Sequence, residues 1–358
     1  MKACFVVYKY SVPLGDACCY PLGFMYVAAL YKQKGFEIKV LNYNLWEYDF
    51  KEEIKGQDIV AFTGFEEFKD LIIRDALVCK EAGIKTILGG ALATFRPDLV
   101  VGHVDKLCIG EHPETSKIDI LPLPLYEEFG IEEYHKRHDA RYMGILASFG
   151  CPYSCTFCSQ VCSYKRRPLQ SVLDEVDLYI KKYNTELIVF NDNTININKK
   201  YVSDLCNGLA SRNVAWGASI RCDNFDEDLA RLFKNSGCSY LVVGIESFNQ
   251  KKLDYVNKQL KVSDIYKTLD LLHKYNIDYH GNILVGFEYE TYEDIAHEVS
   301  LIPEGSNIFP MLVQHFIGTQ HGKVRRISST QEEYLNTCFS NYISSTGRYC
   351  LRTGDKNI

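Results

Sequence analysis

Apolar residues recur along the chain in short runs, separated by stretches in which they have helical spacing. In the first part, to about residue 110, five such runs predict buried strands. Strands that alternate with helices indicate a parallel, doubly wound sheet. The predicted strands are 3–8, 37–42, 58–62, 85–88 and 106–109, and the predicted helices between them include 23–34 and 66–81.

A second alternation of the same kind begins near Arg141. Six β–α steps predict an open, partial barrel rather than a closed eightfold one. Chemistry in such barrels takes place at the carboxyl ends of the strands. The predicted strands are 143–148, 187–191, 215–220, 240–245, 278–285 and 308–317, with helices over 171–182, 199–211, 226–236, 263–275 and 291–300.

These two alternations predict four segments in the 358-residue chain. The sheet domain is expected over 1–110 and the partial barrel over 142–320. Between them, 111–141 is predicted to be a linker, because Leu-Pro-Leu-Pro at 121–124 must be extended and a dense run of charges follows it. The remaining 321–358 are predicted to form a short basic tail.

The composition of the chain limits which binding partners and which cellular compartment are expected. The net charge of −6 argues against a nucleic acid held by bulk electrostatics. No apolar run approaches the length of a membrane span or a signal peptide. The chain is therefore expected in the cytoplasm, where its 14 cysteines stay reduced, and it is expected to function away from oxygen.

Three cysteines carry the most specific chemical signal. Cys151, Cys155 and Cys158 follow an apolar segment at a spacing that lets three thiolates reach one soft metal centre. Three ligands are one fewer than a closed structural zinc or iron–sulfur site requires. The alternative is such a closed site with Cys162 as the fourth ligand, but no second Cys/His pair with zinc-finger spacing follows.

The Cys-x3-Cys-x2-Cys pattern, with Phe157 before its last cysteine, resembles the cluster motif of the radical S-adenosylmethionine (SAM) enzymes. The resemblance implies a [4Fe-4S] cluster on the three cysteines, with an open iron that chelates SAM. Polar residues and a glycine then fall at successive strand ends, where that family binds SAM. Taken singly, each of them has an ordinary reading as a turn, a strand-end bend or half of an ion pair. The SAM-binding residues implied are Phe157, Asn191, Asp192 and Asn193 (receiving the amine), Ser219, Arg221 (holding the carboxylate), Glu246, Ser247 and Gly286 (beside the adenine).

The first domain resembles the cobalamin-binding domain that precedes the barrel in one large radical SAM subfamily. The resemblance rests on Tyr-Pro-Leu-Gly at 20–23, Ile-Leu-Gly-Gly at 87–90 and Ile-Gly-Glu at 109–111. No Asp-x-His-x-x-Gly segment supplies a histidine to cobalt, so the lower face of the cobalt would meet a side chain or water. The alternative is a domain kept as a scaffold without the corrin. The implied cobalamin contacts are Tyr8, Leu14, Gly23, Thr63, Gly64, Gly89, Gly90 and Glu111.

These resemblances imply a Rossmann- or flavodoxin-like domain followed by a partial (β/α)6 TIM-type barrel. They imply a radical SAM enzyme that cleaves SAM to a 5′-deoxyadenosyl radical, with cobalamin-dependent C-methylation of an unactivated carbon as the expected reaction. One alternative is radical rearrangement, cyclisation or coupling without methyl transfer. Another is a non-catalytic protein that binds the cluster and SAM. The expected partners are a one-electron donor such as flavodoxin or ferredoxin and a small-molecule or peptide substrate, which the sequence does not identify.

Overall fold

The computed structural model describes residues 1–9, 20–112, 118, 121–138, 140–159, 162–287 and 289–313. The chain divides into two compact units, with the boundary between Tyr142 and Met143. Three predictions lie outside the described residues: the contact of Leu14 with cobalamin, the end of the last predicted strand beyond 313, and the basic tail over 321–358.

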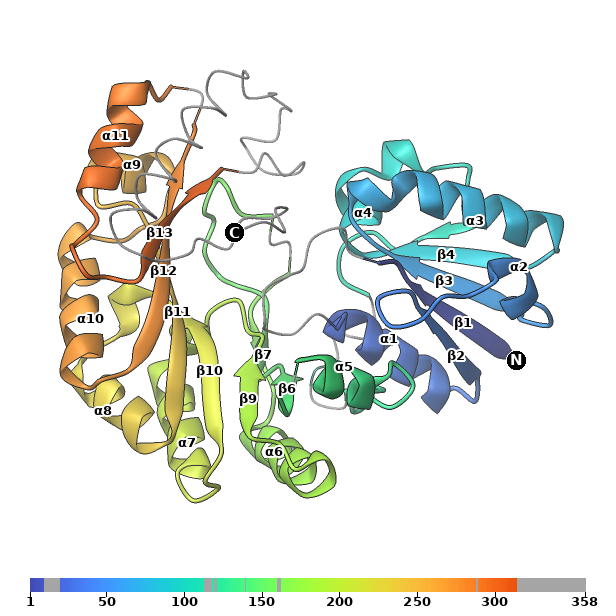
Figure 1. Cartoon of the computed structure of the whole chain (residues 1–358), viewed down its shortest axis with the longest axis horizontal. Helices are drawn as coiled ribbons and strands as arrows, with labels where there is room; N and C mark the ends of the chain where they lie inside the picture. Colours follow the sequence, from blue (N-terminus) through green and yellow to red (C-terminus); the bar gives the residue numbers. More distant parts are fainter. Residues whose placement is uncertain are drawn as a thin grey trace. The chain divides into compact units, whose positions relative to one another are not determined.

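The first unit is built on a five-stranded parallel sheet in the order β2-β1-β3-β4-β5 (Figure 1). The chain moves outward from β1 in one direction to β2 and then in the other direction to β3, β4 and β5. The sheet is therefore doubly wound, as predicted, with its switch point between β1 and β3. All five predicted strands are present: β1 (Lys2–Val7), β2 (Glu37–Asn42), β3 (Ile59–Thr63), β4 (Lys85–Gly89) and β5 (Lys106–Leu107).

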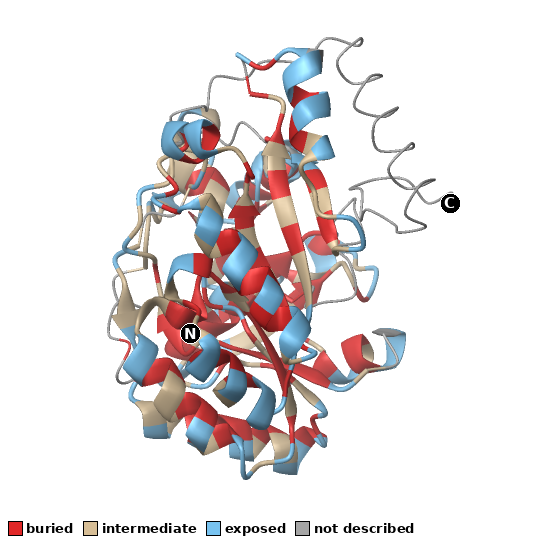
Figure 2. Ribbon diagram, turned by 90° about the vertical axis from the view of Figure 1, so that its left-hand side faces the viewer, coloured by how far each residue is buried: buried red, intermediate tan, exposed pale blue. Residues whose placement is uncertain are grey.

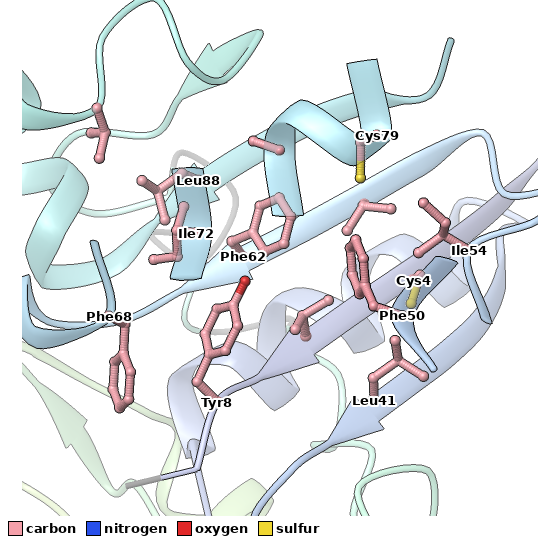
Figure 3. Packing of buried hydrophobic residues seen from close by; sticks show 14 of the residues in the cluster. Cys4, Tyr8, Leu41, Phe50, Ile54, Phe62, Phe68, Ile72, Cys79 and Leu88 are labelled. Atoms are coloured by element: carbon pink, nitrogen blue, oxygen red, sulfur yellow. The ribbon is translucent and has the colours of Figure 1, made fainter. Parts of the chain in front are cut away.

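Helices cover both faces of this sheet because β1 is apolar on both of its faces. Cys4, Val6 and Tyr8 belong to one core cluster with residues of α2 and α3 (Figure 3). On the other face, the ring of Phe5 packs against Phe24 of α1, with ring centroids 4.9 Å apart. The helices of this unit are α1 (Leu22–Gln33), α2 (Phe50–Glu53), α3 (Lys69–Glu81), α4 (Gly90–Phe95) and α5 (Ile131–His138).

The second unit contains a six-stranded sheet in the order β13-β12-β11-β10-β9-β6. Figure 1 shows it as a curved sheet with α7, α8 and α10 along one side, as a partial barrel requires. The strands are β6 (Tyr142–Ile145), β9 (Leu187–Phe190), β10 (Ala215–Ile220), β11 (Cys238–Glu246), β12 (Asp278–Val285) and β13 (Ile308–Leu312). The helices are α6 (Leu169–Tyr183), α7 (Lys199–Leu209), α8 (Glu227–Asn235), α9 (Gln250–Tyr255), α10 (Val262–Lys274) and α11 (Tyr292–Ser300).

Amphipathic helices and buried strands supply the core of this unit, and the alternation of buried and exposed residues can be followed in Figure 2. In α8, Leu229, Ala230 and Phe233 are buried, whereas the residues between them face outward. Phe233 packs on Trp216 of β10, which is fully buried. The helix predicted over 226–236 is therefore confirmed.

Two local features differ from the predicted elements. The apolar run 143–148 does not form one strand but divides into β6 and β7 (Ser148–Phe149), and β7 pairs antiparallel with β8 (Lys165–Arg166). Helix α5 lies in the segment 111–141 that was predicted to be a linker. Its charged residues alternate with Ile131 and Tyr134, which are buried, so it packs as a helix despite its charge.

None of the helices formed by the described residues is long and apolar enough to cross a membrane.

Candidate active site

A pocket of about 240 Å³ lies where strands β10, β11 and β12 meet the cysteine-containing loop. It is entirely within the second unit. Its position at the carboxyl ends of the strands matches the expectation for a barrel of this type. The lining residues are Cys151, Tyr153, Cys155, Phe157, Cys158, Asn193, Thr194, Ser219, Ile220, Arg221, Val242, Val243, Gly244, Glu246, Lys258 and Asn282.

The cysteine loop, residues 150–164, is closed at its base by the pairing of β7 with β8. Gly150 begins the loop with φ +71°, and a Cβ there would lie 2.4 Å from the carbonyl oxygens of both Cys162 and Ser163. Only glycine allows the two ends of the loop to approach so closely. The amide of Cys151 donates to the carbonyl of Cys162 across the same gap. Cys162 thus contributes its backbone to the loop base.

The three predicted cluster cysteines all line the pocket. Burial raises the pKa of the Cys155 thiol, whereas Cys158 is exposed. Among the described residues, no three His, Cys, Asp or Glu side chains are arranged to hold a single metal ion. A cubane cluster is wider than one ion and separates its ligands further. Three soft thiolates around one cavity, with polar groups on its opposite side, fit such a cluster.

Beside the cysteine loop, Lys258 and Glu246 form an ion pair of 2.8 Å at the wall of the pocket. Their side chains are only 7% and 12% exposed. Burial opposes the charge of Lys258, but the neighbouring Glu246 carboxylate outweighs this effect and raises its pKa. Gly244 makes room for the ammonium group, since a Cβ at that position would lie 2.9 Å from Lys258 Nζ.

The backbone around this pair is strained. Glu246 has φ +66°, and the register between β11 and β12 shifts between Gly244 and Glu246. Asn257 and Gln259, on either side of Lys258, also have positive φ. Left-handed residues other than glycine cost free energy, and they concentrate at functional sites. The strain places both charges of the pair at the pocket.

Arg221 lies at the pocket with much of its guanidinium already engaged. Its Nε and Nη2 donate to Asp223, and Nη2 also donates to the carbonyl of Lys258 at 2.7 Å. Tyr153 stacks on the guanidinium, with the ring centroid 3.6 Å from Cζ. Only Nη1 has no hydrogen-bond partner among the described residues, so Arg221 offers a ligand one edge rather than a full fork.

Five of the predicted SAM residues line the pocket and four do not. The five are Phe157, Asn193, Ser219, Arg221 and Glu246. Ser247 is fully buried and donates to Glu298, while the amide of Gly286 donates to Glu290. Asp192 is buried and bonds to the backbone before the cysteine loop, and Asn191 is exposed. Strand-end position therefore did not distinguish residues that face the pocket from residues that support it.

Eight lining residues were not among those predicted: Tyr153, Thr194, Ile220, Val242, Val243, Gly244, Lys258 and Asn282. Tyr153 lies inside the cysteine motif and Asn282 on a predicted strand, so both had a positional signal. Lys258 had none, because it lies beyond α9 and returns to the pocket only through the turn after that helix.

The carboxyl edge of the first unit brings together the loops predicted to bind cobalamin. Thr63 and Gly89 are register partners at the ends of β3 and β4, and Gly64 and Gly90 follow them. Beside them, Phe65 is 50% exposed, and Ile109 after β5 is 60% exposed. Backbone and exposed apolar side chains at a switch-point edge fit a large, flat, partly apolar ligand.

Tyr8 does not extend from this edge. It is 4% exposed, lies in the core near Phe62 and Phe68, and donates its hydroxyl to Asp75 of α3 at 3.0 Å (Figure 3). Gly23 lies in α1, and Glu111 is part of the loop after β5.

Two family models match the chain, and each falls on one of the two structural units. The model of the radical SAM superfamily matches residues 145–302, and that of the B12 binding domain matches residues 16–118. The chain contains a radical SAM domain and, N-terminal to it, a B12-binding domain. Its cofactors are a [4Fe-4S] cluster, SAM and cobalamin, and radical SAM enzymes require a reductant.

Curated relatives match the chain at low identity. The chain is 25% identical to bacteriochlorophyllide d C-12(1)-methyltransferase of Chlorobaculum tepidum, over 84% of this chain and 72% of that protein. It is 22% identical to an uncharacterised methyltransferase of Pyrococcus horikoshii, over 77% and 71%. Over 41% of this chain it is 31% identical to the anaerobic magnesium-protoporphyrin IX monomethyl ester cyclase of Rubrivivax gelatinosus, of which it covers 28%.

Solved structures share the fold. The radical SAM methyltransferase TsrM of Kitasatospora setae, solved with cobalamin and a [4Fe-4S] cluster, superposes with a TM-score of 0.72 at 16% identity, over 89% of this chain and 74% of that one. The cobalamin-dependent radical SAM enzyme OxsB, solved with aqua-cobalamin and SAM, superposes with a TM-score of 0.70 at 14% identity, over 96% and 56%. The doubly wound sheet followed by a TIM-type barrel region is confirmed.

Proposed function

We propose that this radical SAM enzyme transfers a methyl group to an unactivated carbon of its substrate. The observation that carries the radical SAM chemistry is the pocket, which combines three cysteines with two buried cations and a carboxylate at the strand ends. When bound, the cluster and SAM supply a 5′-deoxyadenosyl radical, and methylcobalamin supplies the methyl group.

The residues of the pocket divide by charge into groups suited to different parts of SAM. Cys151, Cys155 and Cys158 hold the cluster. Lys258 and the free edge of Arg221 bind the SAM carboxylate, since both are buried cations at the wall of the pocket. Glu246 is an acceptor for the amine or a ribose hydroxyl, and Asn193 and Ser219 provide further polar contacts.

Phe157 contributes an apolar wall to this reactive site. Phe157 packs with Val256, Phe287, Val313 and Leu284 in a small apolar cluster behind the cysteine loop. A dry wall protects a carbon radical from side reactions with solvent and strengthens the electrostatic contacts around it.

Methyl transfer is favoured over the other radical reactions by the first unit and by the relatives. The unit belongs to the B12-binding domains, and the relatives that match most of both units are named as methyltransferases. The cyclase of Rubrivivax gelatinosus matches over a shorter stretch, which keeps cyclisation without methyl transfer as the second candidate. We further propose a small molecule or peptide as substrate, flavodoxin or ferredoxin as electron donor, and a reducing, anaerobic cytoplasm as the setting.

The test is anaerobic reconstitution of the whole chain with iron, sulfide and cobalamin, followed by reduction in the presence of SAM. Methyl transfer predicts one bound cobalamin per chain and, with a substrate, S-adenosylhomocysteine as well as 5′-deoxyadenosine. Deoxyadenosine alone, from a protein that retains no cobalamin, would favour the cyclase-type reaction. A protein that forms the cluster but never cleaves SAM would contradict both and indicate a binding protein.

A further inference from the structure

Asp192 is a buried carboxylate that the SAM pocket does not use. Its side chain is 3% exposed, and it does not line the pocket, although Asn193 and Thr194 beside it do. Both of its oxygens accept hydrogen bonds from one short segment: Oδ2 from the amide of Ala147 at 2.9 Å, and Oδ1 from the hydroxyl of Ser148. Removing a carboxylate from water costs on the order of several kcal/mol, as for each ion of a buried ion pair. Hydrogen bonds such as these two offset part of that cost.

The segment that Asp192 holds is the base of the cysteine loop. Ser148 is the first residue of β7 and pairs with Arg166 of β8, so it lies where the two ends of the loop are joined. Cys151 follows only three residues after Ser148.

Other groups bind the carbonyl of Ala147, in the next peptide unit along the chain. The carbonyl of Ala147 accepts from the amide of Arg167 at 2.9 Å and from the hydroxyl of Tyr201 at 3.2 Å. Among the described residues, only Asp192 binds both the Ala147 amide and the Ser148 side chain. It therefore controls the direction in which the chain leaves the barrel to enter the loop.

We propose that Asp192 is a positioning residue for the iron–sulfur cluster, acting through Ala147 and Ser148 rather than by contact with SAM. It connects the end of β9, which contributes Asn193 to the SAM pocket, with the base of the loop that carries the cysteines. The cluster and the SAM-binding strand end are thereby held in one fixed arrangement. This role rests on the proposed function, because it requires that the three cysteines bind the cluster.

The experiment compares the reconstituted wild-type chain with Asp192→Ala, Asp192→Asn and Ser148→Ala. We expect the chelator concentration that removes half of the iron to fall about tenfold or more in Asp192→Ala, the range typical of residues that orient metal ligands. The spectral shift of the reduced cluster on SAM addition, seen by electron paramagnetic resonance, should be lost or altered. Asp192→Asn keeps the shape and an acceptor oxygen, so it should recover most of both signals.

Asp75→Ala is the matched control, because Asp75 is an equally buried carboxylate, 1% exposed, but lies in the first unit and bonds to Tyr8. It should leave chelator resistance and the spectrum unchanged. If Asp192→Ala fails to fold by circular dichroism, Ser148→Ala decides, since it removes one of the two bonds and keeps the other.

The outcomes separate this inference from the proposed function. A wild-type chain that assembles no cluster would refute the proposed function itself. A wild-type chain that assembles one, with Asp192→Ala or Ser148→Ala equal to it in chelator resistance and in the SAM-induced shift, would show that Asp192 supports only the fold.

Discussion

Replacing Lys258 by methionine removes one of the two buried cations in the wall of the pocket. The change leaves Glu246, only 12% exposed, without its partner at 2.8 Å. Breaking a buried ion pair by removing one member typically destabilises a protein by about 3–5 kcal/mol, because an uncompensated charge stays behind. We therefore expect Lys258→Met to lower the free energy of unfolding of the second unit by about this amount.

The pair can be tested as a double-mutant cycle with Glu246→Gln. The double variant has no buried charge at this site, so it should regain most of the stability that Lys258→Met loses. Unfolding of the apoprotein by denaturant can be followed through Trp216, which is fully buried in β10. Trp46 is the only other tryptophan, and a Trp46→Phe background removes its signal.

The affinity for SAM should rank the same variants in a different order from their stability. Loss of a charge-assisted hydrogen bond to the carboxylate should weaken the Kd of the reconstituted protein for SAM about 10- to 100-fold in both variants that lack Lys258. Glu246→Gln alone keeps the cation and should bind more tightly than either. An equal free energy of unfolding for Lys258→Met and the wild type would refute the ion-pair argument. An equal Kd for SAM would refute the proposal that Lys258 binds the SAM carboxylate.

Three further changes test the site. Burial raises the pKa of Asp192 to about 6, so the folded chain binds more protons than the unfolded chain between about pH 4 and pH 6. The free energy of unfolding should therefore fall by about 3 kcal/mol as the pH rises through that window. Denaturation curves of Asp192→Asn should lack this fall, and the same pH dependence in the variant and the wild type would contradict the prediction. Gly150→Ala places a Cβ 2.4 Å from two carbonyl oxygens at φ +71°, so the reconstituted variant should retain little iron, whereas an iron content equal to the wild type would show that the loop base relaxes freely. Ser247→Ala removes the hydrogen bond to Glu298 and should lower the free energy of unfolding by about 1–3 kcal/mol without changing the Kd for SAM. A weaker affinity for SAM with unchanged stability would show that Ser247 contacts SAM.

Much of the fold could be predicted from the chain alone, because both sheets are parallel and their strands are nearly continuous apolar runs. The five strands of the first unit were all located by pattern, and their alternation with helices predicted the parallel, doubly wound sheet. Helix α5 was missed because its charge hides the few residues that it buries. The split of 143–148 into β6 and β7 was missed because the run is apolar throughout, so nothing in it marks a change of partner.

The sequence by itself determined the chemistry: the cysteine spacing, the alternation that builds a partial barrel, and the residue types at the strand ends. These are local properties, recorded in neighbouring positions and in a short period. Tertiary structure alone decided which strand-end residues face the pocket and which hold it in place. Asp192 bonds to a segment more than forty residues earlier, and Lys258 reaches Glu246 across a helix and a strained turn. Such pairings depend on the register between strands and on the path of loops, which no local pattern specifies.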